Sequence, residues 1–197
     1  MLIIGLTGSI GMGKSTAAGI LKKMGYPIYD ADKAVHALLK KDGDAVAPIA
    51  GIFPEALKKN AIDRKILGRA VFGDAQKLRR LERILHPLIR KAERAFLKNA
   101  RARKARAAIL EIPLLFETGG EKRCDVTMCV TAPRAIQRAR VMARPHMTEE
   151  KFRAIVARQM PDKAKRARAD FTVPTGIDEA HTRAHLQKIL RRLGLEP

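Results

Sequence analysis

The segment Gly8-Ser-Ile-Gly-Met-Gly-Lys-Ser15 matches the pattern G-x-x-x-x-G-K-[ST], and it constrains the fold more than any other feature. It follows an apolar run at residues 2–6, which is typical of a buried parallel strand, and it precedes a helical pattern that ends before Gly25. Glycines let successive N–H groups turn inward as a nest for phosphate oxygens, and the helix N-terminus adds partial positive charge. The segment therefore predicts a nucleoside triphosphate site.

Each position of this loop has an expected role. Lys14 can reach the β- and γ-phosphates, the Ser15 hydroxyl can ligate Mg²⁺, and the N–H of Thr16 can meet the α-phosphate. The predicted nucleotide-binding residues here are Gly8, Ser9, Ile10, Gly11, Met12, Gly13, Lys14, Ser15 and Thr16.

Apolar runs alternate with helical patterns along the chain. Further strands are predicted at 26–29, 107–112, 125–131 and 171–173, and an amphipathic helix at 178–193. Residues 33–106 are predicted to be mostly helical, with a kink or a break after His86 because Pro87 follows. Residues 134–168 are predicted as basic helices interrupted near Pro145 and Pro161.

This order predicts an α/β fold: a three-layer α/β/α domain like the P-loop nucleoside-monophosphate kinases, with a parallel sheet of about five strands. Two helical insertions complete it. The predicted core comprises 1–32, 107–133 and 169–197; residues 33–106 form an acceptor domain and residues 134–168 a lid.

The positive charge lies mainly in the two insertions. The chain has a net charge of +20 over 197 residues. Residues 58–106 contain 17 Lys/Arg against 4 Asp/Glu, and residues 134–168 contain 11 against 3, so the rest is nearly neutral. A basic nucleic-acid-binding ATPase module remains an alternative, although aromatic residues are only 4% and stacking platforms are scarce.

Several classes are disfavoured by what the sequence lacks. No run of 18 apolar residues predicts a membrane span, and the N-terminus has no basic region or cleavage signal, so we expect a cytoplasmic protein. Cys124 and Cys129 are expected to be reduced core thiols.

No Asp is followed three residues later by Gly, which argues against a GTPase switch. A small-molecule kinase with a closing lid fits better.

Six ordered segments resemble the dephospho-coenzyme A kinase family along nearly the whole chain. They are Leu6–Thr16, Asp30-Ala-Asp32, Leu85-His-Pro-Leu88, Ile112-Pro-Leu-Leu-Phe-Glu117, Gln137-x-x-Arg140-x-x-x-Arg144, and Gln159 followed by Ala169-Asp170. The chain departs from the family at Ser9 and Met12, and at Pro174-Thr-Gly176, where many members carry an Asp-Asn turn.

The resemblance implies transfer of the ATP γ-phosphoryl group to the ribose 3′-hydroxyl of dephospho-CoA, with Mg²⁺. Asp32 matches the proposed base, although it could also cap the helix that follows. Asp30 is expected to be structural or a water-mediated magnesium partner. Glu111 could hold a magnesium-bound water or be a charge at the sheet edge.

Arginines of the predicted lid would neutralise the transferring phosphoryl group, with Arg140 the first candidate, Arg144 the second and Arg138 the third. A solvated helix face is the alternative for each of them. The turn at Pro174, Thr175 and Gly176 is expected to contact the nucleotide.

The acceptor-side candidates share a position in or near the segments that resemble the family: His86, Pro113, Leu114, Leu115 and Glu117. His86 is expected to be a hydrogen-bonded structural residue near the acceptor. The proline and leucines would form an apolar wall, or simply pack in the core, and Glu117 would position the loop or the acceptor. The alternative within the same scaffold is another nucleoside or metabolite kinase, and a monomer is favoured.

Overall fold

The computed structural model describes residues 1–195, so the last two residues of the predicted core lie outside it. The chain forms two compact units. The first comprises Met1–Tyr29 and Ala100–Pro197, and the second comprises Asp30–Asn99. The first unit contains the glycine-rich loop and the sheet, and it is an α/β unit; the second is mainly helical.

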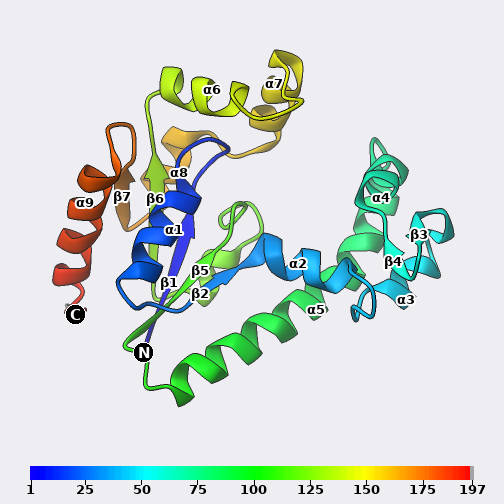
Figure 1. The fold of residues 1–197 in the computed structure, drawn as a ribbon, viewed down its shortest axis with the longest axis horizontal. Coiled ribbons are helices and arrows are strands. Elements are labelled where there is room, and N and C mark those ends of the chain that lie inside the picture. Colours follow the sequence, from blue (N-terminus) through cyan, green and yellow to red (C-terminus); the bar gives the residue numbers. More distant parts are fainter. Residues whose placement is uncertain (196–197) are drawn as a thin grey trace. The chain divides into compact units, whose positions relative to one another are not determined.

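A five-stranded sheet with strand order β2-β5-β1-β6-β7 forms the centre of the α/β fold (Figure 1). Its registers are parallel, and the pairs Leu6↔Glu111 and Thr7↔Cys129 bring the carboxyl ends of neighbouring strands to one edge. The strands are β1 (Leu2–Thr7), β2 (Ile28–Asp30), β5 (Ala107–Glu111), β6 (Val126–Thr131) and β7 (Phe171–Pro174). The predicted parallel sheet of about five strands is confirmed.

Both faces of the sheet are covered, which explains the continuous apolar runs in its strands. On one face, Ile4 and Leu6 of β1 pack with buried side chains of α1 (Lys14–Lys23) and α9 (Glu179–Arg192). On the other face, a Cβ added to Gly5 would lie 2.8 Å from Cys124 Sγ and 2.9 Å from a Leu115 methyl group. The fold is therefore the predicted three-layer α/β arrangement.

The predicted lid consists of three helices that follow β6 in the first unit. They are α6 (Arg134–Met142), α7 (Glu149–Arg158) and α8 (Asp162–Arg168). A short 3-10 helix outside this region, η2 (Gly120–Arg123), precedes β6. The helices are interrupted near Pro145 and Pro161, as the sequence predicts. Thr148 caps α7 by accepting a hydrogen bond from the Lys151 N–H at 3.3 Å.

The second unit contains four helices, one 3-10 turn and one small hairpin. They are α2 (Ala31–Leu39), α3 (Val46–Ala50), η1 (Pro54–Ala56), β3 (Leu57–Lys58), β4 (Ala61–Ile62), α4 (Arg64–Val71) and α5 (Ala75–Ala102), whose last turn belongs to the first unit. The hairpin is absent from the sequence prediction. Lys59 and Asn60 both have positive φ, as a two-residue turn between twisted strands requires, and neither is glycine.

Helix α5 runs through Pro87 without interruption, so of the two predicted outcomes, a kink or a break after His86, the break is wrong. Proline removes one backbone hydrogen bond and costs about 3 kcal/mol inside a helix. Leu81 is buried in the core of the second unit, and Leu85 and Leu88 on either side of Pro87 pack against the same core. Their combined burial, about 1.5–3 kcal/mol for each fully buried side chain, offsets that cost.

Within residues 1–195, none of the helices is both long and apolar enough to cross a membrane.

Candidate active site

The glycine-rich loop between β1 and α1 has the backbone of an anion-binding turn. Gly11 and Gly13 have φ of 75° and 80°, a region that side chains rarely adopt. There is no space for a side chain either: a Cβ on Gly11 would lie 2.6 Å from a Val141 methyl group, and one on Gly13 would lie 2.7 Å from Thr175 Oγ1. No side-chain hydrogen bond caps α1, so its first N–H groups can bind an anion.

Two glutamine side chains hold the peptide groups of Ile10. The Ile10 N–H donates to Gln159 Oε1 at 3.0 Å, and the Ile10 carbonyl accepts from Gln137 Nε2 at 2.8 Å. Gln137 comes from α6 and Gln159 from the connection between α7 and α8. The helices of the predicted lid are therefore hydrogen-bonded directly to the phosphate-binding loop.

Lys14, the first residue of α1, forms an ion pair with Glu111 at the end of β5. Lys14 Nζ lies 3.3 Å from Glu111 Oε1, and the two side chains are 15% and 9% exposed. Because β1 and β5 are parallel neighbours, the carboxylate reaches the ammonium group at the carboxyl edge of the sheet. Ser15 and Thr16 follow and are exposed.

Thr175 joins the turn after β7 to the phosphate-binding loop. Its hydroxyl donates to the Met12 carbonyl at 2.8 Å. Arg140 of α6 donates to the Thr175 hydroxyl at 3.2 Å and to its carbonyl at 2.6 Å. Arg140, the first of the predicted arginines, is therefore linked to the phosphate-binding loop through Thr175.

The other two predicted arginines, Arg138 and Arg144, have different environments from Arg140. Arg138 pairs with Glu149 at 2.9 Å, so the same predicted lid provides its partner. Arg144 lies in the connection after α6 and is exposed. Gly176 packs closely, because a Cβ there would lie 2.5 Å from Pro133, and Pro174 is the last residue of β7.

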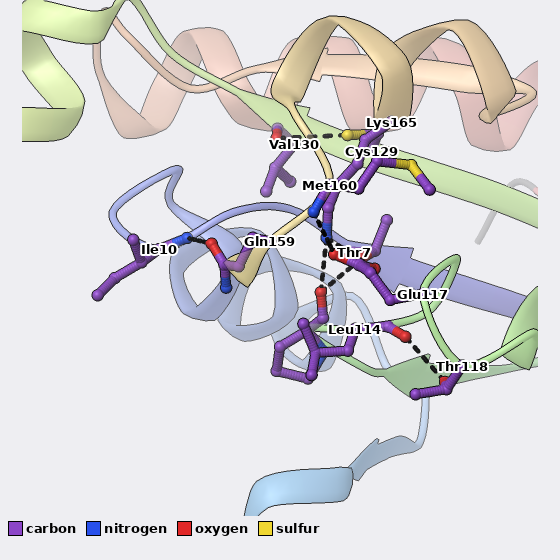
Figure 2. A network of polar contacts seen from close by, with 11 residues as sticks. Thr7, Ile10, Leu114, Glu117, Thr118, Cys129, Val130, Gln159, Met160 and Lys165 are labelled. Carbon is purple, nitrogen blue, oxygen red and sulfur yellow. Dashed lines mark hydrogen bonds and ion pairs between the residues drawn. The ribbon is translucent and has the colours of Figure 1, made fainter. Parts of the chain in front are cut away.

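The loop after β5 is fastened by a buried lysine that the sequence prediction missed. Lys165 of α8 is fully buried, and its Nζ lies 2.8 Å from the Pro113 carbonyl and 2.9 Å from Glu117 Oε1 (Figure 2). Nothing in the sequence distinguishes Lys165 from Lys163 two residues earlier. The difference becomes visible only when α8 is placed against β6.

Glu117 is held in its ionised form. Partial burial raises the pKa of Glu117, but hydrogen bonds from Lys165 and from the Met160 N–H outweigh this, so the pKa lies below its ordinary value of 4.5. Its side chain is 18% exposed, although its backbone is open to solvent. A carboxylate that is paired with a buried lysine and ionised at neutral pH suits positioning rather than proton transfer.

The neighbouring leucines have separate environments. Leu115 is fully buried and contacts the sheet at Gly5, so it is a core residue. Leu114 is 40% exposed and is available for an apolar wall. Asp170 is structural: its carboxylate accepts from the Thr127 N–H at 2.8 Å and hydroxyl at 2.7 Å.

Three candidates belong to the second unit. The N-cap of α2 is Asp30, which accepts from the Lys33 N–H at 2.9 Å and pairs with its ammonium at 3.0 Å. Asp32 lies in the first turn and is exposed, so the alternative that it caps the helix is wrong. His86 is exposed on α5.

The residues at the loop fit a magnesium–nucleotide complex. The glycine cradle and the uncapped helix provide N–H donors for phosphate, Lys14 provides a cation, and the exposed Ser15 hydroxyl is an oxygen ligand of the kind that Mg²⁺ prefers. Among residues 1–195, no group of three or more acidic, histidine or cysteine side chains could hold a metal alone.

The parallel sheet, the glycine-rich loop and Lys14 at the start of α1 define a P-loop nucleotide-binding protein. Comparison with known proteins gives the family. The model of the dephospho-CoA kinase family matches residues 2–178, and the chain belongs to that family.

Individual relatives agree with this assignment. The chain is 54% identical over 166 residues to the dephospho-CoA kinase of Paramagnetospirillum magneticum. This alignment covers 84% of this chain and 78% of the relative. A crystal structure of a Thermus thermophilus protein has a TM-score of 0.83 at 39% identity and covers 98% of this chain and 97% of its own. The dephospho-CoA kinase structure from Campylobacter jejuni has a TM-score of 0.72 at 29% identity, with coverage of 97% and 96%.

Proposed function

We propose that this chain transfers the γ-phosphoryl group of ATP to the ribose 3′-hydroxyl of dephospho-CoA, giving CoA and ADP. The bond between the γ-phosphorus and the β,γ-bridging oxygen breaks, and a bond to the 3′-oxygen forms. The proton of the hydroxyl passes to a base, and ADP leaves with the bridging oxygen. Membership of the family together with the glycine cradle at Gly11 and Gly13 supports this proposal.

Lys14 is the proposed contact to the β- and γ-phosphates. Its ammonium group lies 3.3 Å from Glu111 Oε1. Binding of a triphosphate would bring phosphate oxygens to the same cation and leave Glu111 near the bound Mg²⁺ ion, in the water-mediated position proposed for it. The ion itself, with Ser15 as its ligand, would neutralise charge on the phosphates.

Asp32 is the proposed general base. It follows β2, whose carboxyl end is where open parallel sheets bind ligands, and its carboxylate is exposed. Asp30, two residues earlier, caps α2 and thereby fixes the backbone from which Asp32 projects. A base of this kind removes the hydroxyl proton as the phosphoryl group is transferred.

Arg140 is the proposed transition-state cation, supported by Arg144. Its guanidinium group is held by Thr175, whose hydroxyl is bonded to the Met12 carbonyl of the loop. This anchorage supports the proposed role of Arg140, because it holds a permanently charged guanidinium group beside Thr175. The backbone of Pro174, Thr175 and Gly176 is proposed to contact the nucleotide.

The acceptor is proposed to contact Pro113 and Leu114, and Glu117 is proposed to fix the position of that loop. The role of His86 near the acceptor stays a prediction. Leu115, proposed from the sequence as part of the same wall, supports it from the core. The cytoplasmic location and the monomeric state stay predictions.

A coupled assay of ADP formation tests the proposal. The chain is offered ATP and Mg²⁺ with dephospho-CoA, adenosine, AMP or shikimate in separate reactions. We expect ADP formation that depends on dephospho-CoA and exceeds the rate with each other acceptor. Equal or faster turnover with adenosine, AMP or shikimate would assign the chain to another metabolite kinase.

A further inference from the structure

We propose that Lys165 is a positioning residue for phosphoryl transfer: its buried ammonium group fixes the acceptor-side loop, Pro113 to Glu117, to the end of β1. The inference rests on the proposed function, because that function assigns this loop to the acceptor. It concerns a residue that contacts neither nucleotide nor acceptor in the proposed mechanism.

Lys165 donates two hydrogen bonds and forms one ion pair inside the protein. Its Nζ donates to the Pro113 carbonyl at 2.8 Å and to Glu117 Oε2 at 3.2 Å, and it lies 2.9 Å from Glu117 Oε1. The side chain has no exposed surface, so water cannot replace these acceptors. A lysine that is buried in this way is held in one conformation by its partners.

The contacts extend from Lys165 to the phosphate-binding loop by two routes (Figure 2). The Pro113 carbonyl also accepts from Thr7 Oγ1 at 3.1 Å, and Thr7 directly precedes the loop. Glu117 Oε1 accepts from the Met160 N–H at 2.9 Å, while the adjacent Gln159 accepts from the Ile10 N–H at 3.0 Å.

Lys165 contacts the acceptor-side loop directly, but it is linked to the phosphate-binding loop only through other residues. The phosphate-binding loop has further attachments, from Gln137 to Ile10 and from Thr175 to Met12. For the loop after β5, Lys165 joins the carbonyl at its start to the carboxylate at its end. Loss of the ammonium group should therefore disturb acceptor binding while ATP binding is retained.

The first test compares Lys165→Met with Arg166→Met, using full-length protein at a temperature where both are folded. Arg166 is the control because it is a basic residue of α8 that also pairs with a carboxylate, but its partner, Asp162 at 2.8 Å, lies in the same helix. We expect Lys165→Met to raise KM for dephospho-CoA about tenfold and to leave KM for ATP within about twofold. Arg166→Met should change neither KM. An equal rise in both constants for Lys165→Met would overturn the proposal.

The second test separates positioning from charge balance. Lys165→Met leaves Glu117 as an uncompensated charge, so Tm should fall by roughly 10 °C. The double variant Lys165→Met/Glu117→Leu removes both charges and should recover at least half of that loss. Positioning by the Pro113 and Met160 contacts is still lost, so KM for dephospho-CoA should stay raised. Recovery of that KM together with Tm would show that Lys165 only neutralises Glu117, and would overturn the proposal.

Glu117→Gln provides the same test if Lys165→Met does not fold. It keeps the size of the side chain and an oxygen acceptor for the Met160 N–H, and it weakens the bond to Lys165. We expect KM for dephospho-CoA to rise about threefold with KM for ATP nearly constant; an unchanged acceptor KM would contradict the proposal. Absence of any turnover by the wild-type chain with dephospho-CoA would instead overturn the proposed function.

Discussion

Two lysine–glutamate pairs flank the end of β5, and their environments differ. Lys14 and Glu111 lie 3.3 Å apart, and both side chains keep a small exposed area of 15% and 9%. Lys165 and Glu117 lie 2.9 Å apart, and the lysine has no exposed area at all. The first ammonium group can exchange its carboxylate partner for an entering phosphate, whereas the second is enclosed by its acceptors. The same residue types are thus suited to chemistry in one place and to positioning in the other.

The comparison predicts that catalytic and structural effects fall on different residues. Replacing an exposed group that performs chemistry should lower activity and leave stability nearly unchanged. Replacing one member of a buried pair should lower stability and disturb the positions of the residues that the pair contacts. The predictions below use this contrast, in order of decreasing effect.

Asp32→Asn should have the largest effect on turnover. The side chain is exposed in the first turn of α2, so Tm should be nearly unchanged, while loss of the proposed base should lower kcat roughly 10²–10⁴-fold. ATP binding, measured by titration calorimetry, should be retained. A kcat close to that of the wild type would remove Asp32 from the role of base.

Lys14→Met should reduce kcat/KM about 10²–10³-fold, because it removes the cation proposed to bind the transferring phosphate. ATP binding should weaken as well, in contrast to Asp32→Asn. Its Tm should fall less than that of Lys165→Met, since Glu111 keeps some exposure to water once its partner is lost. The reverse ranking of the two variants in Tm would contradict the contrast between the pairs.

Acid should weaken the Lys165–Glu117 pair. The pKa of Glu117 is lower in the folded chain than its ordinary value of 4.5, so ionised Glu117 stabilises the fold above that pH. This contribution is lost as the pH falls through the lower, folded pKa. The free energy of unfolding of the wild type, measured by urea titration, should therefore exceed that of Glu117→Gln at pH 7 and approach it in acid.

Glu179→Gln is the control for this pH series. Glu179 pairs with Lys23 at 3.3 Å, but both side chains are more than half exposed, and such surface pairs contribute about 0–1 kcal/mol. Its stability should follow that of the wild type at every pH. A difference of the same size for both variants would show that the effect does not arise at the buried pair.

The sequence allows much of the first unit to be predicted, for identifiable physical reasons. Continuous apolar runs indicate strands covered on both faces, and the positive φ of Gly11 and Gly13 needs residues without a Cβ. These signals are local. The parallel sheet and the strand–turn–helix unit at the loop follow from them.

The failures come from packing between distant segments and from one turn that lacks its usual residue. Pro87 predicts a kink or a break, but packing of Leu81 and Leu85 with the core of the second unit keeps α5 continuous. The hairpin at Lys59 and Asn60 forms without the glycine that usually marks such a turn. The sequence does not distinguish Lys165 from the other basic residues of α8, because its burial depends on the packing of α8 against β6.

Analysis of the reaction product tests the central claim most directly. Wild-type chain, ATP, Mg²⁺ and dephospho-CoA are incubated, and the products are followed by ³¹P NMR and mass spectrometry. We predict one new phosphomonoester on the ribose 3′-oxygen, formed in equal amount to ADP. Formation of ADP together with inorganic phosphate, or phosphorylation at another position, would contradict the account.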